Sequence, residues 1–321
     1  MESETRYHPN PDQLALANTI EESLTPLLPV SRLHSSPEEN DKTWSSLDEI
    51  GIFAITASEE EGGSGLGAVE EALIVMALGR CLASPGVMAT MGSAHATPDV
   101  GAPALRGRRI AAGFRRGDRI AAVANTGAEW VLVRETAGAG VYAVDLRTSR
   151  LIDSRLWLAE MREYAIPGRP VAQFEPSQLL RLRLIDAAAL AGISQAALEM
   201  SVAYAGVREQ FGRPIGSFQA IKHHCANMAI AASCARDQTS FAAVAIDDGR
   251  EDAALQVESA FWVAGSAALE NAGKNIQIHG GIGFSDEADP HLFLKRAQLL
   301  IAIAGGLEAS NRRIANARAG W

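Results

Sequence analysis

Residues 208–219 of this 321-residue chain read Arg-Glu-Gln-Phe-Gly-Arg-Pro-Ile-Gly-Ser-Phe-Gln and carry the strongest local signal in the sequence. Two glycines and a proline in so short a stretch predict a tight turn between two helices. The arginine side chains, the ring of Phe211 and the amide of Gln219 surround that turn with cations, an aromatic face and a hydrogen-bonding group. Such a turn can hold a phosphate-bearing ligand, but taken alone the stretch is explained more simply as a helix hairpin with a solvated charge pair.

A second glycine-rich motif, Gln-Ile-His-Gly-Gly-Ile-Gly-Phe, occupies residues 277–284 and directly follows a long apolar segment. Glycines let a backbone approach a pyrophosphate closely, and their N–H groups can donate to its oxygens. The motif lacks the preceding strand of a dinucleotide-binding fold and the Gly-Lys-Ser/Thr of a nucleotide-binding P-loop. A glycine-rich end of a helix is an equally good interpretation of these residues.

The first hundred residues favour helices joined by turns. Leucine and isoleucine residues between 14 and 24 recur at roughly helical spacing, and Pro26 and Pro29 end this helix. A second helix, through Trp44, breaks at Gly51, and a glycine-rich loop over 59–67 leads into a third helix over 69–78. That third helix is apolar nearly all round and must be covered by other helices. Residues 1–100 are therefore predicted to form an N-terminal helical domain.

The middle of the chain changes from helical spacing to short β-prone runs. These runs lie at 120–123, 130–133 and 140–144 and are separated by Gly, Asp and Asn. They predict a small antiparallel sheet, in a reduced β domain over residues 101–174.

Helical periodicity returns at about residue 177 and continues to the end. Alanines between 187 and 197 permit close helix packing, and further helices are expected over 217–247, 251–278 and 287–317. Residues 175–321 are therefore predicted to form a C-terminal four-helix bundle. The expected fold is mainly α with a small central β domain.

Composition excludes several classes of protein. Hydrophobic residues make up 47% of the chain and charged residues 21%, which argues against disorder, and a net charge of −9 argues against nucleic-acid or anionic-membrane binding. Three cysteines without CxxC spacing suggest neither a disulfide framework nor a zinc site, and the histidines show no metal-ligand spacing. No bound metal is therefore expected. The N-terminus is acidic, unlike that of a signal peptide, and no long apolar run is present, so a soluble, cytoplasmic protein is expected.

Taken together, in this order and about 60 residues apart, the two glycine-containing motifs resemble the acyl-CoA dehydrogenase family. Residues 44–67 also resemble that family's helix, glycine turn and glycine-rich loop. The resemblance covers most of the chain except its middle. It implies an N-terminal helical domain, a central β domain, a C-terminal four-helix bundle, FAD at a subunit interface and an acyl-CoA substrate.

In this family two subunits hold each FAD, and the chain resembles the two halves of that site unequally. The half donated to a neighbour's FAD looks intact: the resemblance assigns the pyrophosphate contact to Arg208 and further cofactor contacts to Gln210, Phe211, Gln219, Gln277, Gly280 and Gly281. The half that holds a subunit's own flavin ring is poorly matched, since the family's threonine-glutamate-proline stretch is absent. Its nearest fragments are residues 122–127 and Trp130, and Trp130 is expected in the core.

The catalytic base of the family, a glutamate that removes the α-proton of the thioester, has no match in this chain. Gly305 occupies its usual position and Leu182 the alternative one, so the catalytic residue is unknown. Asp186 lies one helical turn after Leu182 and could act from a displaced position, but a helix cap or a salt bridge to Arg183 explains it better. Glu308 is expected to be a solvated or ion-paired helix residue.

The resemblance thus implies a subunit of a heteromeric FAD-dependent acyl-CoA dehydrogenase that clamps the FAD of a catalytic partner subunit, in an α2β2 heterotetramer. The implied substrates are bulky acyl-CoA thioesters, including those of steroid degradation, and the implied electron acceptor is electron-transfer flavoprotein. Two alternatives remain open. One is a self-sufficient dehydrogenase with a displaced base such as Asp186, and the other is a non-enzymatic interaction subunit.

Overall fold

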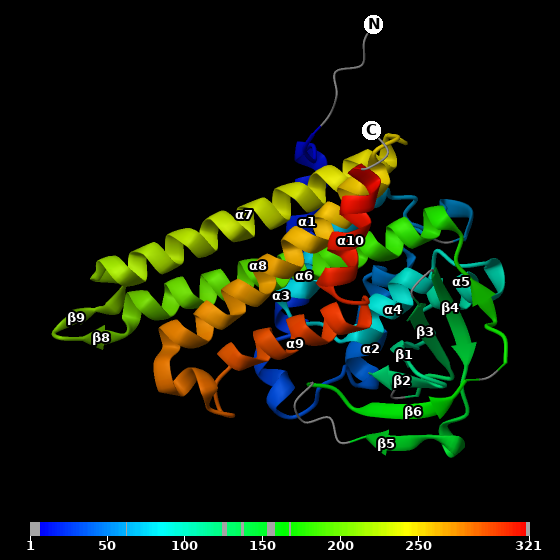
Figure 1. Ribbon diagram of the computed structural model, residues 1–321, viewed down its shortest axis with the longest axis horizontal. Helices are drawn as coiled ribbons and strands as arrows, with labels where there is room; N and C mark the ends of the chain where they lie inside the picture. The colour runs from blue at the N-terminus through cyan, green and yellow to red at the C-terminus, as the bar shows by residue number, and fades with distance from the viewer. Residues whose placement is uncertain are drawn as a thin grey trace, which may run out of the picture.

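The computed structural model describes residues 7–61, 63–123, 127–135, 138–152, 158–166 and 168–318. Helices dominate, and one sheet lies beside the N-terminal helices at one side of the molecule (Figure 1). The long C-terminal helices extend from this body toward the opposite side. The predicted fold, mainly α with a small β portion, is confirmed. None of the helices in these ranges is long and apolar enough to cross a membrane.

The N-terminal region is helical, as predicted. Its helices are α1 (Pro11–Leu27), α2 (Asp41–Glu49), α3 (Ala68–Arg80), α4 (Pro85–Ser93) and α5 (Pro98–Leu105), with 3-10 turns η1 (Val30–His34), η2 (Ile52–Ala54) and η3 (Glu59–Glu61). Helix α2 stops before Gly51, whose φ of 84° lies in the left-handed region that glycine adopts at little cost. Most of α3 is buried, in agreement with its apolar surface.

The sheet has seven strands in the order β5-β6-β2-β1-β3-β4-β7. They are β1 (Ile110–Arg116), β2 (Arg119–Val123), β3 (Trp130–Glu135), β4 (Gly138–Ala143), β5 (Arg150–Ile152), β6 (Met161–Ala165) and β7 (Ala172–Gln173). The three predicted runs correspond to β2, β3 and β4. Strands β1, β5, β6 and β7 were not predicted. Strand β1 was missed because its Ala- and Gly-rich beginning and Arg-rich end lack the β-branched alternation of a typical strand.

The prediction of an antiparallel sheet is wrong in one respect, because β1 and β3 pair in parallel, with Ile110 beside Trp130. Strands β1 and β2 form a hairpin, and the chain then crosses to the other edge of β1 before β3 begins. Since β1 separates β2 from β3, those two strands cannot form a hairpin, and β3 runs in the direction of β1. Local β-propensity contains no information on this order of strands.

The C-terminal region consists of α6 (Pro176–Val207), α7 (Gln219–Asp247), α8 (Ala253–His279), α9 (Pro290–Ile303) and α10 (Leu307–Arg318). A small hairpin of β8 (Glu209–Gln210) and β9 (Arg213–Pro214), followed by η6 (Ile215–Ser217), joins α6 to α7, and η7 (Gly280–Phe284) follows α8. The single helix predicted over 287–317 is wrong. Gly305 and Gly306, with φ of 89° and 84°, break it into α9 and α10.

Small residues set the spacing of the core helices. A Cβ atom at Gly192 of α6 would lie 2.0 Å from the carbonyl oxygen of Met76 in α3, and one at Gly79 of α3 would lie 2.2 Å from the carbonyl oxygen of Ala189 in α6. The backbones of α3 and α6 are therefore in direct contact, as the alanine-rich stretch predicted. We retain the limits 1–100, 101–174 and 175–321 as a proposed division into domains.

Candidate functional site

The hairpin after α6 presents Phe211 to solvent. Phe211 and Gly212 form its two-residue turn with φ of 53° and 77°, a pair of left-handed residues that is typical of type I′ hairpins. A non-glycine residue in this region is uncommon, and the Phe211 side chain is 92% exposed. Its ring lies edge-on to that of Phe218, over which the guanidinium of Arg213 also packs at 4.3 Å. The hairpin thus holds an exposed aromatic ring at the end of the helices.

Backbone hydrogen bonds fix Arg208 at the end of α6. Arg208 is the C-cap of α6, where its N–H donates to the carbonyl oxygen of Tyr204 and its own carbonyl oxygen accepts from the N–H of Ile215. A Cβ atom at Gly216 would lie only 2.9 Å from the carbonyl oxygen of Ala205, so glycine allows the chain to return onto α6. Helix α7 then begins at Gln219, and the side chains of both Arg208 and Gln219 are exposed.

The second motif ends α8 and contains glycines of two kinds. Gly280, with φ of 66°, is the C-cap, and its N–H donates to the carbonyl oxygen of Gln277. A Cβ atom at Gly283 would lie 2.6 Å from the carbonyl oxygen of Ile276, so the turn itself requires glycine there. Gly281 does not have a left-handed φ, and no atom lies within 4 Å of the position that an added Cβ atom would take. The fold of this chain does not require glycine at 281, and the open space above it leaves room for a ligand.

The structure brings the two motifs to the same end of the long helices (Figure 1). The ring of Tyr204, one turn before Arg208, stacks on that of His279 with centroids 4.0 Å apart. His279 Nδ1 lies 2.8 Å from the carbonyl oxygen of Asn275, and burial lowers the pKa of this histidine. The stacked rings thus connect the Arg208 turn directly to the glycine turn.

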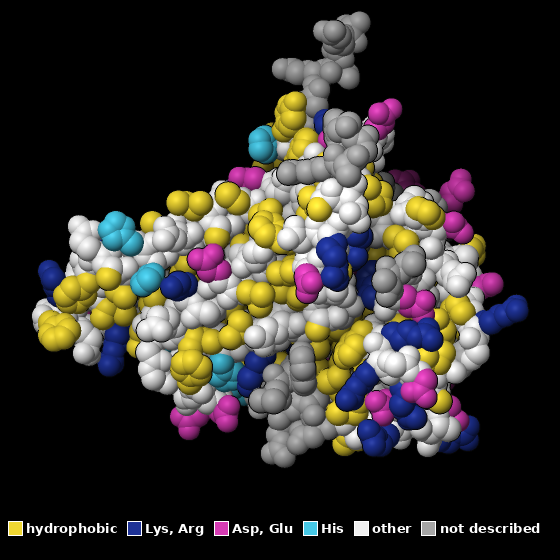
Figure 2. Space-filling view, in the orientation of Figure 1, with side chains coloured by type: hydrophobic (Ala, Val, Ile, Leu, Met, Phe, Trp, Pro, Cys, Tyr) yellow, Lys and Arg dark blue, Asp and Glu magenta, His cyan; other side chains and the backbone are white. Residues whose placement is uncertain are grey.

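Exposed apolar side chains lie at the same end of the long helices as the two motifs. In Figure 2 this end is the tip of the molecule farthest from the sheet. Val207, Phe211, Ile282 and Phe284 are each more than half exposed. Several large apolar side chains exposed together mark an interaction surface more often than a solvated one. The end of the helices therefore combines phosphate-compatible groups with a surface suited to a partner.

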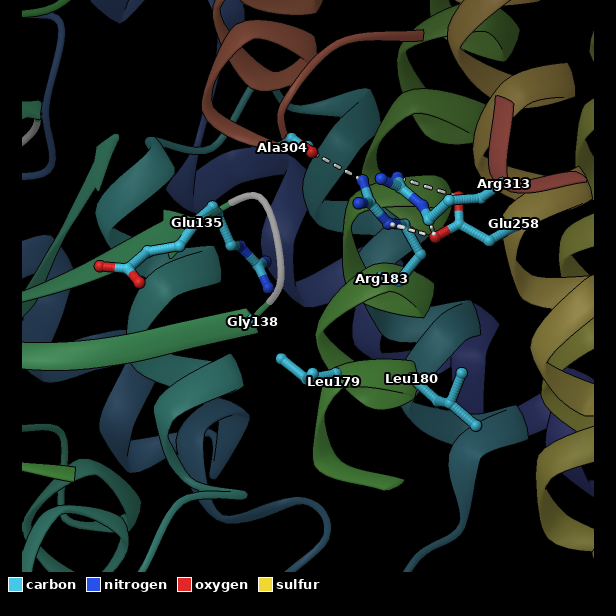
Figure 3. Close-up of a pocket in the computed structure, with 9 residues that line it drawn as sticks. Glu135, Gly138, Leu179, Leu180, Arg183, Glu258, Ala304 and Arg313 are labelled. Carbon is cyan, nitrogen blue, oxygen red and sulfur yellow. Dashed lines mark hydrogen bonds and ion pairs between the residues drawn. The ribbon is translucent and has the colours of Figure 1, made fainter. Parts of the chain in front are cut away.

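The two positions that correspond to a catalytic base lie far from this end. Gly305 is in the turn between α9 and α10, and Leu182 in α6 is fully buried. Arg183, next to Leu182, donates from Nη1 to the carbonyl oxygen of Ala304, at 2.8 Å. Both positions therefore belong to one region, which contains a cavity of about 250 Å³. Arg183, Ala304 and seven other residues line it (Figure 3).

Asp186 forms a buried ion pair and is not an open carboxylate. Its side chain is 10% exposed, and Oδ1 accepts from Arg134 Nη2 at 3.0 Å, while Arg183 Nη1 lies 3.9 Å from Oδ2. Burial raises the pKa of Asp186, and the two arginines oppose that shift. The salt bridge to Arg183 was predicted, whereas Arg134 was missed because it comes from β3, about 50 residues earlier.

The other weighed residues have ordinary surroundings. The Glu308 carboxylate is 85% exposed and lies 3.0 Å from Arg312, as predicted for an ion-paired helix residue. Trp130 is half-buried in β3, and the guanidinium of Arg108 stacks on its ring at 4.1 Å. Of the fragment around residues 122–127, positions 124–126 lie outside the described residues.

Comparison with known proteins places these features in a family. The family model "Acyl-CoA dehydrogenase, N-terminal domain" matches residues 10–108, and "Acyl-CoA dehydrogenase, C-terminal domain" matches residues 175–320. The chain belongs to the acyl-CoA dehydrogenase family. The two matches leave out the middle region, which is also where the sequence resemblance was weakest.

Two curated relatives come from Mycobacterium tuberculosis. Acyl-CoA dehydrogenase FadE34 is 33% identical over 86% of this chain, but the chain spans only 42% of the length of FadE34. Acyl-CoA dehydrogenase IpdE2 is 30% identical over 80% of each protein. Among solved structures, the steroid acyl-CoA dehydrogenase Tcur3481-Tcur3483 (G363A variant) has a chain that superimposes with a TM-score of 0.80 at 22% identity, covering 96% of this chain and 98% of its own.

Acyl-CoA dehydrogenases are FAD-dependent flavoproteins. Two regions of this chain bear on FAD: the end of the long helices, with Arg208 and Gly281, and the turn at Gly305. The end of the helices fits its diphosphate, because it offers an exposed arginine and an unobstructed glycine backbone. The region around Gly305 does not fit the family's catalytic arrangement, because neither base position carries a carboxylate. The assignment of the individual cofactor contacts remains a prediction.

Proposed function

We propose that this chain is the FAD-clamping subunit of a heteromeric acyl-CoA dehydrogenase. The observation that carries the proposal is the contrast between two ends of the same molecule. Arg208, Phe211 and the backbone at Gly281 are exposed and open toward a neighbour, whereas the chain's own base positions hold a glycine and a buried leucine. A chain that has kept one half of a shared site and lost the other needs a partner that carries the lost half.

In this proposal each clamp residue has a physical role. The Arg208 guanidinium pairs with the pyrophosphate, a charge-assisted contact that suits its planar fork. The open backbone at Gly281 would face the diphosphate, and the Phe211 ring would exclude water from the contact. Gln210, Gln219 and Gln277 supply amides for further hydrogen bonds. When bound, FAD would supply the hydride acceptor for the substrate, and the base would come from the catalytic partner.

The proposed substrates are bulky CoA thioesters, including those of steroid degradation. The similarity of the fold to that of a steroid acyl-CoA dehydrogenase supports this class. We further propose an α2β2 assembly, electron-transfer flavoprotein as the electron acceptor and a cytoplasmic location.

The first alternative, a self-sufficient dehydrogenase that uses Asp186 as its base, is disfavoured by the geometry. A base must reach the α-proton of the substrate, but the Asp186 carboxylate is buried and bonded to Arg134. In the folded complex, Asp186→Asn should leave turnover of an acyl-CoA substrate essentially intact. Complete loss of turnover in a complex of unchanged flavin content would favour the alternative instead.

The second alternative, a non-enzymatic interaction subunit, is tested by Arg208→Ala in the complex with the proposed catalytic partner subunit. The loss of one charge-assisted contact, roughly 1.5–3 kcal/mol, should weaken FAD binding about 10- to 100-fold. Arg236→Ala is the matched control, because Arg236 lies on the exposed surface of α7 and pairs with Asp237. Equal FAD affinity in the two variants would contradict the clamp and favour an interaction role.

A further inference from the structure

A second cavity adjoins the one in Figure 3, and the two share part of their walls. Their volumes are about 250 and 350 Å³, and the shared residues are Arg134, Glu135, Arg183, Ala304 and Arg313. They lie between the beginning of α6, the end of β3 and the turn that joins α9 to α10. Cavities of a few hundred Å³ are of the size that small organic ligands occupy in proteins.

Arginine dominates the charge of these walls. The five arginines that line the two cavities are Arg115, Arg134, Arg183, Arg312 and Arg313, and the two carboxylates are Glu135 and Glu258. Two further carboxylates pair with these arginines from outside the walls, Asp186 from the buried side and Glu308 from the solvent. Five arginines against these four carboxylates leave one positive charge in excess, which favours a ligand of negative charge.

The carboxylates do not use all the donors of the arginines. Arg313 donates to Glu258 from Nε and Nη2, and Arg183 uses Nη1 for Ala304 and Nε for Glu258. Each guanidinium has five N–H donors in a fixed fork. Within the described part of the chain, both cavity-lining arginines therefore keep N–H donors that these carboxylates do not use.

Apolar side chains complete the walls. Leu179 and Leu180 line the smaller cavity, and Phe114, Ile303 and Ala309 line the larger one. A ligand that fills the space would place a charged group on the arginines and a short apolar part against these side chains.

We propose that the two cavities form a binding site for a small amphiphilic anion, a carboxylate or phosphate attached to a short apolar chain. Carboxylates and phosphates are the groups whose geometry matches a guanidinium fork. The site is independent of the proposed clamp, because it lies in the region where this chain has lost the family's base, and its ligand binds to this chain alone.

The test uses the full-length chain and calorimetric titration with three probes of equal chain length: octanoate, octyl phosphate and neutral octanamide. The test variant is Arg115→Gln with Arg312→Gln, since both side chains are about half or more exposed and can be replaced without opening the core. The control is Arg147→Gln with Arg236→Gln, which removes the same charge from other exposed positions. Equal thermal unfolding temperatures establish that both variants are folded.

The proposal expects saturable one-to-one binding of octanoate, octyl phosphate or both, and none of octanamide. The test variant should bind the anion about tenfold more weakly or worse, because two of the five arginines that line the cavities are lost, and the control should bind as the unaltered chain does. Binding of neither anion, equal binding of octanamide, or unchanged binding by the test variant would overturn the proposal. None of these results bears on FAD retention in the complex, so the two proposals fail separately.

Discussion

Replacing Gly192 by alanine should destabilise the chain, although alanine is the better helix former. The added Cβ atom would lie 2.0 Å from the carbonyl oxygen of Met76 and 2.9 Å from the backbone nitrogen of Arg80. Ordinary contacts at a Cβ atom begin at about 3.4 Å. Because the obstructing atoms belong to the backbone of α3, no side-chain rotation relieves the overlap, and α3 must move away from α6 by more than 1 Å.

The magnitude follows from two opposing effects. Alanine gains about 1 kcal/mol over glycine inside a helix. Overpacking a close-packed core costs about 1–3 kcal/mol and sometimes more, and the rigid obstruction places this site at the upper end. Gly192→Ala should therefore lower the free energy of unfolding by about 2 kcal/mol.

Gly206→Ala in the same helix is the matched control, because nothing lies within 4 Å of its Cβ position and Gly206 is exposed. It should raise the free energy of unfolding by about 0.5–1 kcal/mol. Urea denaturation followed by circular dichroism at 222 nm measures both changes. Equal stabilisation by the two substitutions would refute the direct backbone contact of α3 with α6.

Two further predictions concern the glycine turn and the beginning of α8. Gly281→Ala should change the free energy of unfolding of this chain by less than about 0.5 kcal/mol, because its Cβ position is open. In the complex the same change should weaken FAD binding roughly tenfold, since the added methyl group would enter the space next to the pyrophosphate. Unchanged FAD release in a fluorescence assay would contradict the proposal that the backbone at Gly281 binds the pyrophosphate. Hydrogen bonds from Arg250 and Gln256 lower the pKa of Asp252 from 3.8 to about 2. A lowered pKa in the folded state stabilises the fold above pH 4, and that contribution is lost as the pH falls from 4 to 2. Asp252→Asn should therefore reduce the loss of stability over this range, measured as the urea midpoint at several pH values, and an unaltered pH profile would count against the hydrogen bonds.

The sequence predicted those features that depend on local spacing. The break at Gly51, the apolar third helix and the close approach of helices through small residues all follow from residues near one another in the chain. The parallel pairing of β1 with β3 could not be predicted in this way, because it depends on where the chain crosses between strands. The break at Gly305 and Gly306 was hidden by the helical spacing of apolar residues on both sides.

The candidate sites show the same limit. The motifs around Arg208 and Gly281 were recognised from sequence, but the stacking of Tyr204 on His279 that joins them needs the packing of α6 against α8. The arginine-lined cavities were missed entirely. Their arginines come from β1, β3, α6 and α10, and each arginine alone resembles an ordinary surface cation.

The most direct measurement is the FAD content of the chain expressed alone and of its complex with the proposed catalytic partner subunit. Absorbance of released FAD, divided by the protein concentration, gives the number of flavins per chain. The proposed clamp predicts no retained FAD on the chain alone and one FAD for each pair of unlike subunits in the complex. A full complement of FAD on the chain alone would contradict the account, and the flavin ring would then have to be sought in this chain's own central region.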